Sequence, residues 1–134
     1  MLTHMLDTDT VSFWFRGHQS VRRNLNRISA LQLCISSITL AELRVGPFRR
    51  NSLKINASIN TFVSKIQVTP FDRAAAERFA EIGNVLLSQG TPIGEFDTLI
   101  AAQALSLNLI LVTNNIRHFS RVRGLRIENW VEDE

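Results

Sequence analysis

Short apolar runs alternate along the whole chain with longer segments in which apolar residues recur every three or four positions. This alternation is typical of a parallel β-sheet that is covered by helices. The runs that we expect to form strands are short and bounded by polar residues: 2–6, 33–37, 66–69, 109–113 and 125–128. The sequence therefore predicts an α/β fold, and its 134 residues suit one domain that spans 1–134.

Helical spacing is clearest in three of the longer segments. Their apolar residues are Val21, Leu25 and Ile28 in the first, Ile55, Ile59, Phe62 and Val63 in the second, and Phe79, Ile82, Val85 and Leu86 in the third. We expect the third helix to begin with Asp72 as its N-cap and to end near Gly90. Residues 45–51 are expected to form an exposed loop, because Pro47 should end the preceding helix.

The chain carries a net charge of only +3, although its isoelectric point is near 10, because it has no tyrosine and one cysteine to titrate above neutrality. Arginines outnumber lysines and gather in three clusters along the chain. The planar guanidinium group suits bidentate contacts with phosphate, so the clusters are candidate nucleic-acid contacts. An ordinary solvated surface would explain them equally well.

The single cysteine, Cys34, lies inside an apolar run and has no partner for a disulfide. Its presence indicates a reducing compartment, and we expect a thiol in the core of a cytoplasmic protein. No run approaches the roughly 18 apolar residues that a membrane-spanning helix needs, so no membrane contact is expected.

Carboxylates stand beside several apolar runs, at Asp7, Asp9, Glu42 and Asp97. Burial of a carboxylate is costly unless a cation or hydrogen-bond donors compensate its charge. Asp7 and residues 114–115 each follow a predicted strand, and the carboxyl ends of parallel strands meet at one edge of a sheet. Carboxylates that meet at such an edge suggest a shared metal ion.

Two of these acids have simpler alternatives. Glu42 is expected within the first turn of a helix that starts around Thr39, where it would be favoured by the helix dipole alone. Asp97 shares one helix face with Ile100, Ala101, Ala104 and Leu105, and backbone amides at the helix start would be able to satisfy it. Glu95, two residues earlier, is expected to point away into solvent. His4, His18 and His118 are too scattered to form a zinc site with Cys34, so structural or surface roles are their default.

The chain resembles the PIN-domain ribonucleases, and among them the VapC-type toxins of bacterial toxin–antitoxin pairs. Five segments in order carry the resemblance: MLDTDT at the start, CISSITLAELRVG (34–46), TPFDRAAAERFAEIGNVLL (69–87), GTPIGEFDTLIAAQALSLNLILVTNN (90–115) and RVRGLRIENW (121–130). The resemblance implies a three-layer α/β/α fold with a central, mainly parallel sheet. It also implies endonucleolytic cleavage of RNA, a divalent metal held by acidic residues, inhibition by a cognate antitoxin, and homodimerisation.

Carried over by motif, Asp7, Glu42 and Asp97 match the three main acidic residues of the family. An oxygen-rich set favours Mg²⁺ or Mn²⁺, with Asp7 and Asp97 as principal ligands. Glu42 would bind the ion through water or would position or deprotonate the nucleophile, and Asn115 would orient a ligand or the phosphate. We therefore expect Asp7, Glu42, Asp97 and Asn115 to be catalytic.

This sequence departs from the family around residues 114–120, where relatives commonly carry a further acid and this chain offers Asn114, Asn115, His118 and Ser120. Asp9 stands where many relatives have Asn; it either adds compensating charge or caps the next helix. The candidates for supporting contacts in these segments are Thr8, Asp9, Thr113 and His118. The candidates for RNA phosphate contacts, closest in sequence beyond Glu42, are Arg44, Arg49 and Arg50.

Two alternatives stay open. MLDTDTV and LILVTNN also look like the first two motifs of haloacid-dehalogenase-type phosphatases, with Asp7 as nucleophile and Asp9 as general acid, but no lysine follows Asn115. The second alternative is a non-catalytic module that binds RNA or an antitoxin, if the altered fourth position abolishes turnover.

Overall fold

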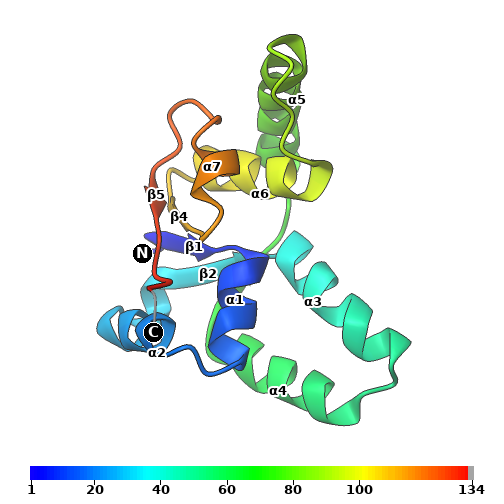
Figure 1. Cartoon of the computed structure of the whole chain (residues 1–134), viewed down its shortest axis with the longest axis vertical. Helices are drawn as coiled ribbons and strands as arrows, with labels where there is room; N and C mark the ends of the chain where they lie inside the picture. The colour runs from blue at the N-terminus through cyan, green and yellow to red at the C-terminus, as the bar shows by residue number, and fades with distance from the viewer. Residues whose placement is uncertain (133–134) are drawn as a thin grey trace.

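A five-stranded parallel sheet forms the centre of the computed structural model, which describes residues 1–132 (Figure 1). The strands are β1 (His4–Leu6), β2 (Leu33–Ser36), β3 (Gln67–Thr69), β4 (Ile110–Val112) and β5 (Ile127–Glu128). Their order is β3-β2-β1-β4-β5, and every neighbouring pair is parallel. The α/β prediction is confirmed, and all five expected strands are present within a few residues of their predicted ends.

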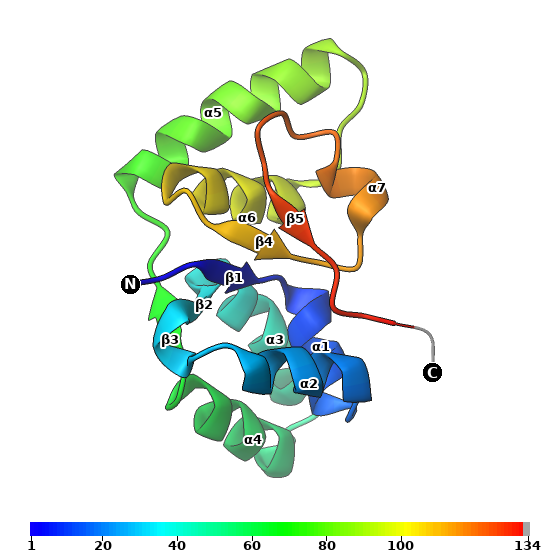
Figure 2. The same cartoon turned by 90° about the vertical axis from the view of Figure 1, so that its left-hand side faces the viewer.

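Helices cover both faces of this sheet (Figure 2). They are α1 (Thr8–Phe15), α2 (Gln19–Arg27), α3 (Ser37–Arg49), α4 (Leu53–Val63), α5 (Arg73–Ser88), α6 (Glu95–Ser106) and α7 (Ile116–Phe119), with a 3₁₀ turn at Ala30–Gln32. Helices α5, α6 and α7 lie on one side of the sheet, and α1 to α4 lie on the other. The three layers predicted by the resemblance are therefore present.

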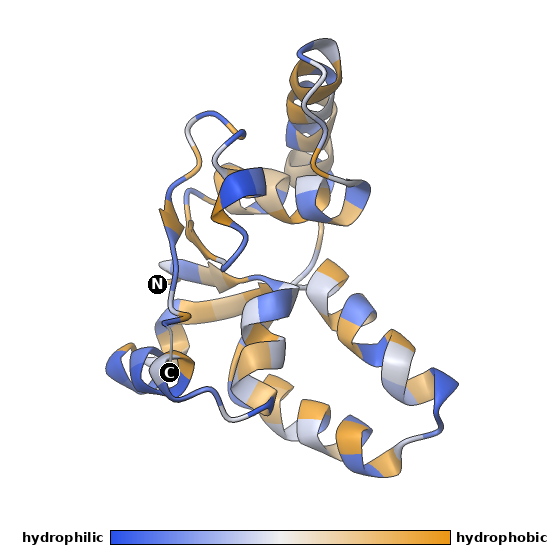
Figure 3. Cartoon of the chain, in the orientation of Figure 1, coloured by the Kyte–Doolittle hydropathy of each residue, from blue (hydrophilic) through white to orange (hydrophobic). Residues whose placement is uncertain are grey.

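Each face of the sheet has its own hydrophobic core. Neighbouring residues of a strand contribute to opposite cores, because successive side chains point to opposite faces. Met5 and Leu111 pack with α5, α6 and α7, whereas Leu6 and Val112 pack with α1 to α4. All four are fully buried. Cys34 is also fully buried on the α5–α6 side, which confirms the expected core thiol. Figure 3 shows the hydrophobic residues that run along the strands.

The cap expected for α5 is confirmed. Asp72 accepts a hydrogen bond from the Ala75 backbone N–H at 3.0 Å, and the helix ends at Ser88. Gly90 follows with φ of +69°, a left-handed conformation that glycine adopts without strain.

The prediction that Pro47 ends the preceding helix is wrong. Helix α3 continues to Arg49, and Pro47 is buried inside its last turns. Proline at this position removes one helical N–H donor and crowds the preceding turn, and the apolar surface that Pro47 buries helps to offset this cost. The turn into α4 comes later, where Asn51 adopts φ of +53° and the Ser52 N–H donates to the Pro47 carbonyl at 2.8 Å. Only the end of the segment is therefore an exposed loop.

Within residues 1–132, no helix has the length and apolar character that crossing a membrane requires.

Candidate active site

The parallel pairing of β1 and β4 places Asp7 and the 113–115 segment side by side at the carboxyl edge of the sheet. Leu6 pairs with Val112, and the Asp7 N–H extends this ladder by donating to the Val112 carbonyl at 3.0 Å. The expected meeting of these two strand ends is confirmed. Asp7 is also the N-cap of α1, because its Oδ1 accepts from the Thr10 N–H at 2.8 Å. The cap is therefore Asp7, and the alternative that Asp9 caps this helix is wrong.

Asp7 is buried, with 3% of the residue exposed, and this burial raises its pKa to about 6. Hydrogen bonds from Thr113 and Thr10 oppose the increase, and the charge of Asp9 adds to it. Thr113 thus contacts the carboxylate, and its supporting role in the site stays a prediction. A positive charge close to Asp7 would lower this pKa again and favour the ionised form.

Glu42 lies in the second turn of α3. The helix starts at Ser37 because Ser36, the last residue of β2, caps it by accepting from the Ile38 N–H at 3.0 Å. The expectation that Glu42 lies within the first turn is therefore wrong, and the helix dipole does not account for it. Instead, the Thr8 hydroxyl donates to Glu42 Oε1 at 2.7 Å. Thr8 holds the Glu42 carboxylate next to the start of α1, and its supporting role in the site stays a prediction.

Asp97 is the third residue of α6, just after Gly94, whose φ is +96°. The face that Asp97 shares with Ile100, Ala101 and Ala104 is buried as predicted. Burial raises the pKa of Asp97, and the negative charges of Glu42 and Asp9 raise it further. The three acids therefore act on one another across segments that are far apart in the sequence.

His118 is the group that most favours the charged form of Asp97, since both its charge and its hydrogen bonding lower the Asp97 pKa. Its Nδ1 lies 3.9 Å from Asp97 Oδ2 and 2.9 Å from Asn115 Nδ2, with which it is hydrogen-bonded. Asn115 in turn donates its backbone N–H to Thr113 Oγ1 at 2.9 Å. The 113–118 segment thus contacts Asp7 through Thr113 and Asp97 through His118, and the Asn115 side chain orients His118.

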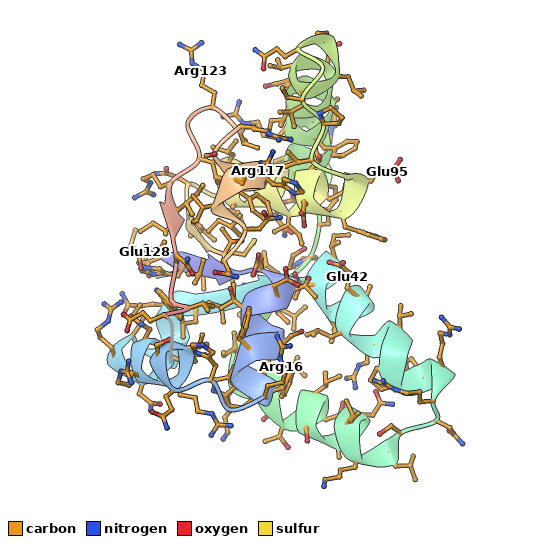
Figure 4. All side chains as sticks on the ribbon, viewed as in Figure 1. Arg16, Glu42, Glu95, Arg117, Arg123 and Glu128 are labelled. Carbon is orange, nitrogen blue, oxygen red and sulfur yellow. The ribbon has the colours of Figure 1, made fainter. Side chains whose placement is uncertain are left out.

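Glu95 is exposed and points away from the other acids, as expected (Figure 4). Among residues 1–132, no three side chains of His, Cys, Asp or Glu surround one point closely enough to hold a metal ion together. The acids that are gathered at the sheet edge, Asp7, Asp9, Glu42 and Asp97, interact electrostatically without forming such a cage.

A cavity of about 640 Å³ lies along α1, α3 and α4, and Asp9 and Glu42 are the two of these acids that line it. Its polar lining residues are Thr8, Asp9, Ser12, Arg16, Glu42 and Arg50. Arg50 thus lines the same cavity as Asp9 and Glu42, whereas Arg49 is exposed outside this lining. Arg44 faces α4 instead, where it donates to Asn56 Oδ1 at 3.0 Å and to Asn60 Oδ1 at 2.6 Å.

Arg16 was not among the residues that we expected from the sequence. It stands alone outside the arginine clusters. The one feature of the sequence that could have identified it is its position eight residues after Thr8, which is two helical turns along the same face. Figure 4 shows Arg16 near the end of α1 and Glu42 near its start.

The family profile of the PIN domain matches residues 4–125 of the chain. The chain is 43% identical over 131 residues to the tRNA(fMet)-specific endonuclease VapC of Shigella flexneri, covering 97% of this chain and 99% of that protein. It is 42% identical over 137 residues to ribonuclease VapC2 of Haemophilus influenzae, covering 98% and 100% of the two chains.

A solved structure of the DNA-bound VapBC complex from Salmonella typhimurium contains a chain that superimposes with a TM-score of 0.90 at 40% identity, over 97% of this chain and 99% of that one. The VapBC2 complex from Rickettsia felis gives a TM-score of 0.85 at 32% identity, over 96% and 99%. These full-length matches leave no support for the phosphatase alternative. The chain belongs to the PIN-domain family, among the VapC proteins of toxin–antitoxin systems.

Proposed function

We propose that this protein is the toxin of a toxin–antitoxin pair, an endoribonuclease that hydrolyses RNA phosphodiester bonds and is held inactive by a cognate antitoxin. The proposal is supported by the contacts between three distant segments in a chain that matches VapC ribonucleases over its full length: Thr8, next to Asp7, donates to Glu42, and the charges of Glu42 and Asp9 act on Asp97. The pKa values of Asp7 and Asp97 are both raised, so the folded protein keeps these acids in an arrangement that is costly without a cation.

The residues at the sheet edge fit a hard divalent cation. Their donor atoms are carboxylate oxygens, which suit Mg²⁺ or Mn²⁺. Because no three of the described acids and histidines surround one point, Asp7 and Asp97 would hold the ion directly, and Glu42 and Asp9 would act through water. This arrangement is ordinary for Mg²⁺, which retains several waters and takes one or two protein carboxylates. The bound ion would stabilise charge on the phosphate and favour ionisation of water.

The protein's own groups would then divide the remaining tasks. Glu42, fixed by the Thr8 hydroxyl, would orient the attacking water and accept its proton. Charged His118, whose Nδ1 lies 3.9 Å from Asp97 Oδ2, would keep that carboxylate ionised, with the side-chain oxygen of Asn115 turned toward the same nitrogen. Asn115 therefore acts through His118, as a positioning residue, and Thr113 acts on Asp7 in the same way.

For the substrate, we propose initiator tRNA as the first RNA to test, because the relatives in Shigella flexneri and Salmonella typhimurium are named as tRNA(fMet)-specific endonucleases and are 43% and 39% identical to this chain. For the partner, we propose a small antitoxin that places a cationic side chain against the acids. The cytoplasmic location expected from the single cysteine stays a prediction.

We also propose that the protein forms a homodimer. Large apolar side chains are exposed on the outer surfaces of α3, α5 and α6, at Val45, Phe48, Leu87 and Phe96. Contiguous apolar surface is typical of regions that another chain covers, and these four side chains are our candidates for such a surface. Sedimentation equilibrium of the antitoxin-free protein would test this proposal, and a monomer at all concentrations would contradict it.

The experiment that tests the catalytic proposal is cleavage of a mixed cellular RNA pool and of initiator tRNA, with added Mg²⁺ or Mn²⁺. The intact protein, an EDTA control and the Asp97→Asn variant are compared. Metal-dependent cuts that disappear in the variant would support the proposal. A folded, antitoxin-free protein that binds RNA and never cuts it would instead favour the non-catalytic alternative.

A further inference from the structure

We propose that the cavity between α1, α3 and α4 holds the single-stranded stretch of RNA next to the cleaved bond, and that Arg16 and Arg50 bind the phosphates of that stretch. The inference rests on the proposed ribonuclease function and adds the path of the substrate. The cavity, of about 640 Å³, has Thr8, Asp9 and Glu42 at one end. It therefore leads directly away from the acids at the sheet edge.

Two of the three helices that border the cavity, α1 and α3, follow the same order of charge. On α1, Thr8, Ser12 and Arg16 lie four residues apart, and on α3 the same spacing joins Glu42, Gly46 and Arg50. Residues four apart occupy one helix face and advance about 6 Å along the axis. Each helix thus presents oxygen atoms near the acids and a guanidinium group further along the cavity.

The two arginines are free to bind an anion. Both are exposed, and within residues 1–132 neither forms an ion pair with a carboxylate. The Arg16 guanidinium lies 4.5 Å from the centre of the Phe13 ring. A Cβ atom on Gly46 would lie 3.3 Å from Arg50 Nη2, so the absent side chain at Gly46 leaves room for Arg50 to fold back along α3.

Arg44 of α3 differs from Arg16 and Arg50 because its guanidinium group is already hydrogen-bonded within the protein. Its guanidinium is used to join α3 to α4 through Asn56 and Asn60. It therefore stiffens the wall of the cavity and is not available for phosphate.

The rest of the lining is apolar, at Phe15, Leu43, Pro47, Ile55 and Ile59. A cavity with cationic rims and an apolar floor suits an unpaired strand, whose phosphates and base faces need these two kinds of contact. The same arginines would offset the repulsion between the acids and the RNA backbone, and would attract the strand in a manner that salt weakens. A protein segment is the competing occupant, and the experiment distinguishes the two.

Binding is measured in the Asp97→Asn background, so that RNA is not consumed, with a fluorescent single-stranded RNA of mixed sequence at several salt concentrations. We expect Arg16→Ala and Arg50→Ala each to weaken binding roughly fivefold and to reduce the slope of log affinity against log salt by about 0.7, the value for one phosphate contact on a single strand. Arg16→Lys and Arg50→Lys keep the charge and should retain most of the slope. Arg123→Ala removes the same charge from an exposed turn far from Glu42 and should change neither quantity (Figure 4).

Each outcome separates this inference from the proposed function. If the intact protein cuts RNA with metal but the Arg16 and Arg50 variants bind RNA as the Arg123 variant does, the path is wrong and the function stands. If those variants bind RNA normally but lose affinity for the antitoxin, the cavity is a protein-binding site and the inference is overturned. If the intact protein neither binds nor cuts RNA, the proposed function itself fails.

Discussion

Replacement of Asp7 by Asn is expected to make the metal-free protein more stable while it abolishes RNA cleavage. Asp7 is 3% exposed, and its pKa is raised from 3.8 to about 6. Asparagine has nearly the same shape and is an equally good N-cap, so the hydrogen bond from the Thr10 N–H can be kept. The variant therefore removes the buried charge and little else.

The sign of the effect follows from linkage between protonation and folding. Between pH 3.8 and about 6, Asp7 ionises in the unfolded chain and stays protonated in the folded one, so stability falls as pH rises. Above about pH 6 the penalty is complete, and a shift of about 2 pKa units corresponds to roughly 3 kcal/mol. The amide introduced by the substitution places its N–H₂ group where the carboxylate accepted hydrogen bonds from hydroxyl groups, and this mismatch lowers the unfolding free energy by about 1 kcal/mol. The net gain in unfolding free energy is therefore about 2 kcal/mol.

Urea denaturation with EDTA present, at about pH 7.5 and at about pH 4, measures this difference. We expect the variant to be more stable by about 2 kcal/mol at the higher pH, a rise in Tm of roughly 6–8 °C, and to lose that advantage at the lower pH. An equal effect of the substitution at both pH values would refute the reasoning, because the gain would not come from the carboxylate charge. A cleavage assay in Mg²⁺ checks that activity is lost.

Three further predictions test other parts of the site and fold. Thr8→Val removes the 2.7 Å hydrogen bond to Glu42 and should lower kcat roughly tenfold with little change in KM; an unchanged kcat would mean that Glu42 needs no such support. Asp72→Ala removes the N-cap of α5 and should lower the unfolding free energy by about 1 kcal/mol without affecting cleavage, and a loss of activity at equal stability would contradict this. Saturating Mg²⁺, at about 100 times its Kd, should stabilise the intact protein by about 2.7 kcal/mol in a thermal melt, whereas Asp97→Asn should gain much less; equal gains would place the ion elsewhere.

The parts of the site that sequence analysis could predict are those that follow from local pattern and sheet geometry. Asp7 and Asn115 each follow a buried run, and in a parallel sheet such positions converge. Asp97 was identified by the helical spacing of Ile100, Ala101 and Ala104, which are all buried. The same spacing rules gave α5 with its cap at Asp72.

The errors and omissions concern contacts between distant segments. Pro47 obeys a local rule that tertiary packing overrides, because the residue is buried in the last turns of α3. The bond between Thr8 and Glu42 spans 34 residues, and His118 reaches Asp97 from a different helix. Local spacing carries no information about such pairs, so Thr8 and His118 were at most candidates for supporting contacts.

The central position of β1 has a consequence for how the protein comes to be active during synthesis. Strand β1 is made first, yet it pairs with β2 on one side and with β4 on the other, and β4 ends at Val112. Until β4 has emerged, Asp7 lacks the Val112 carbonyl and the Thr113 hydroxyl that fix it. Helix α6, which carries Asp97, directly precedes β4 in the chain. A growing chain therefore cannot assemble these acids, and the RNA cleavage that we propose for them would have to wait until nearly the whole protein has been made.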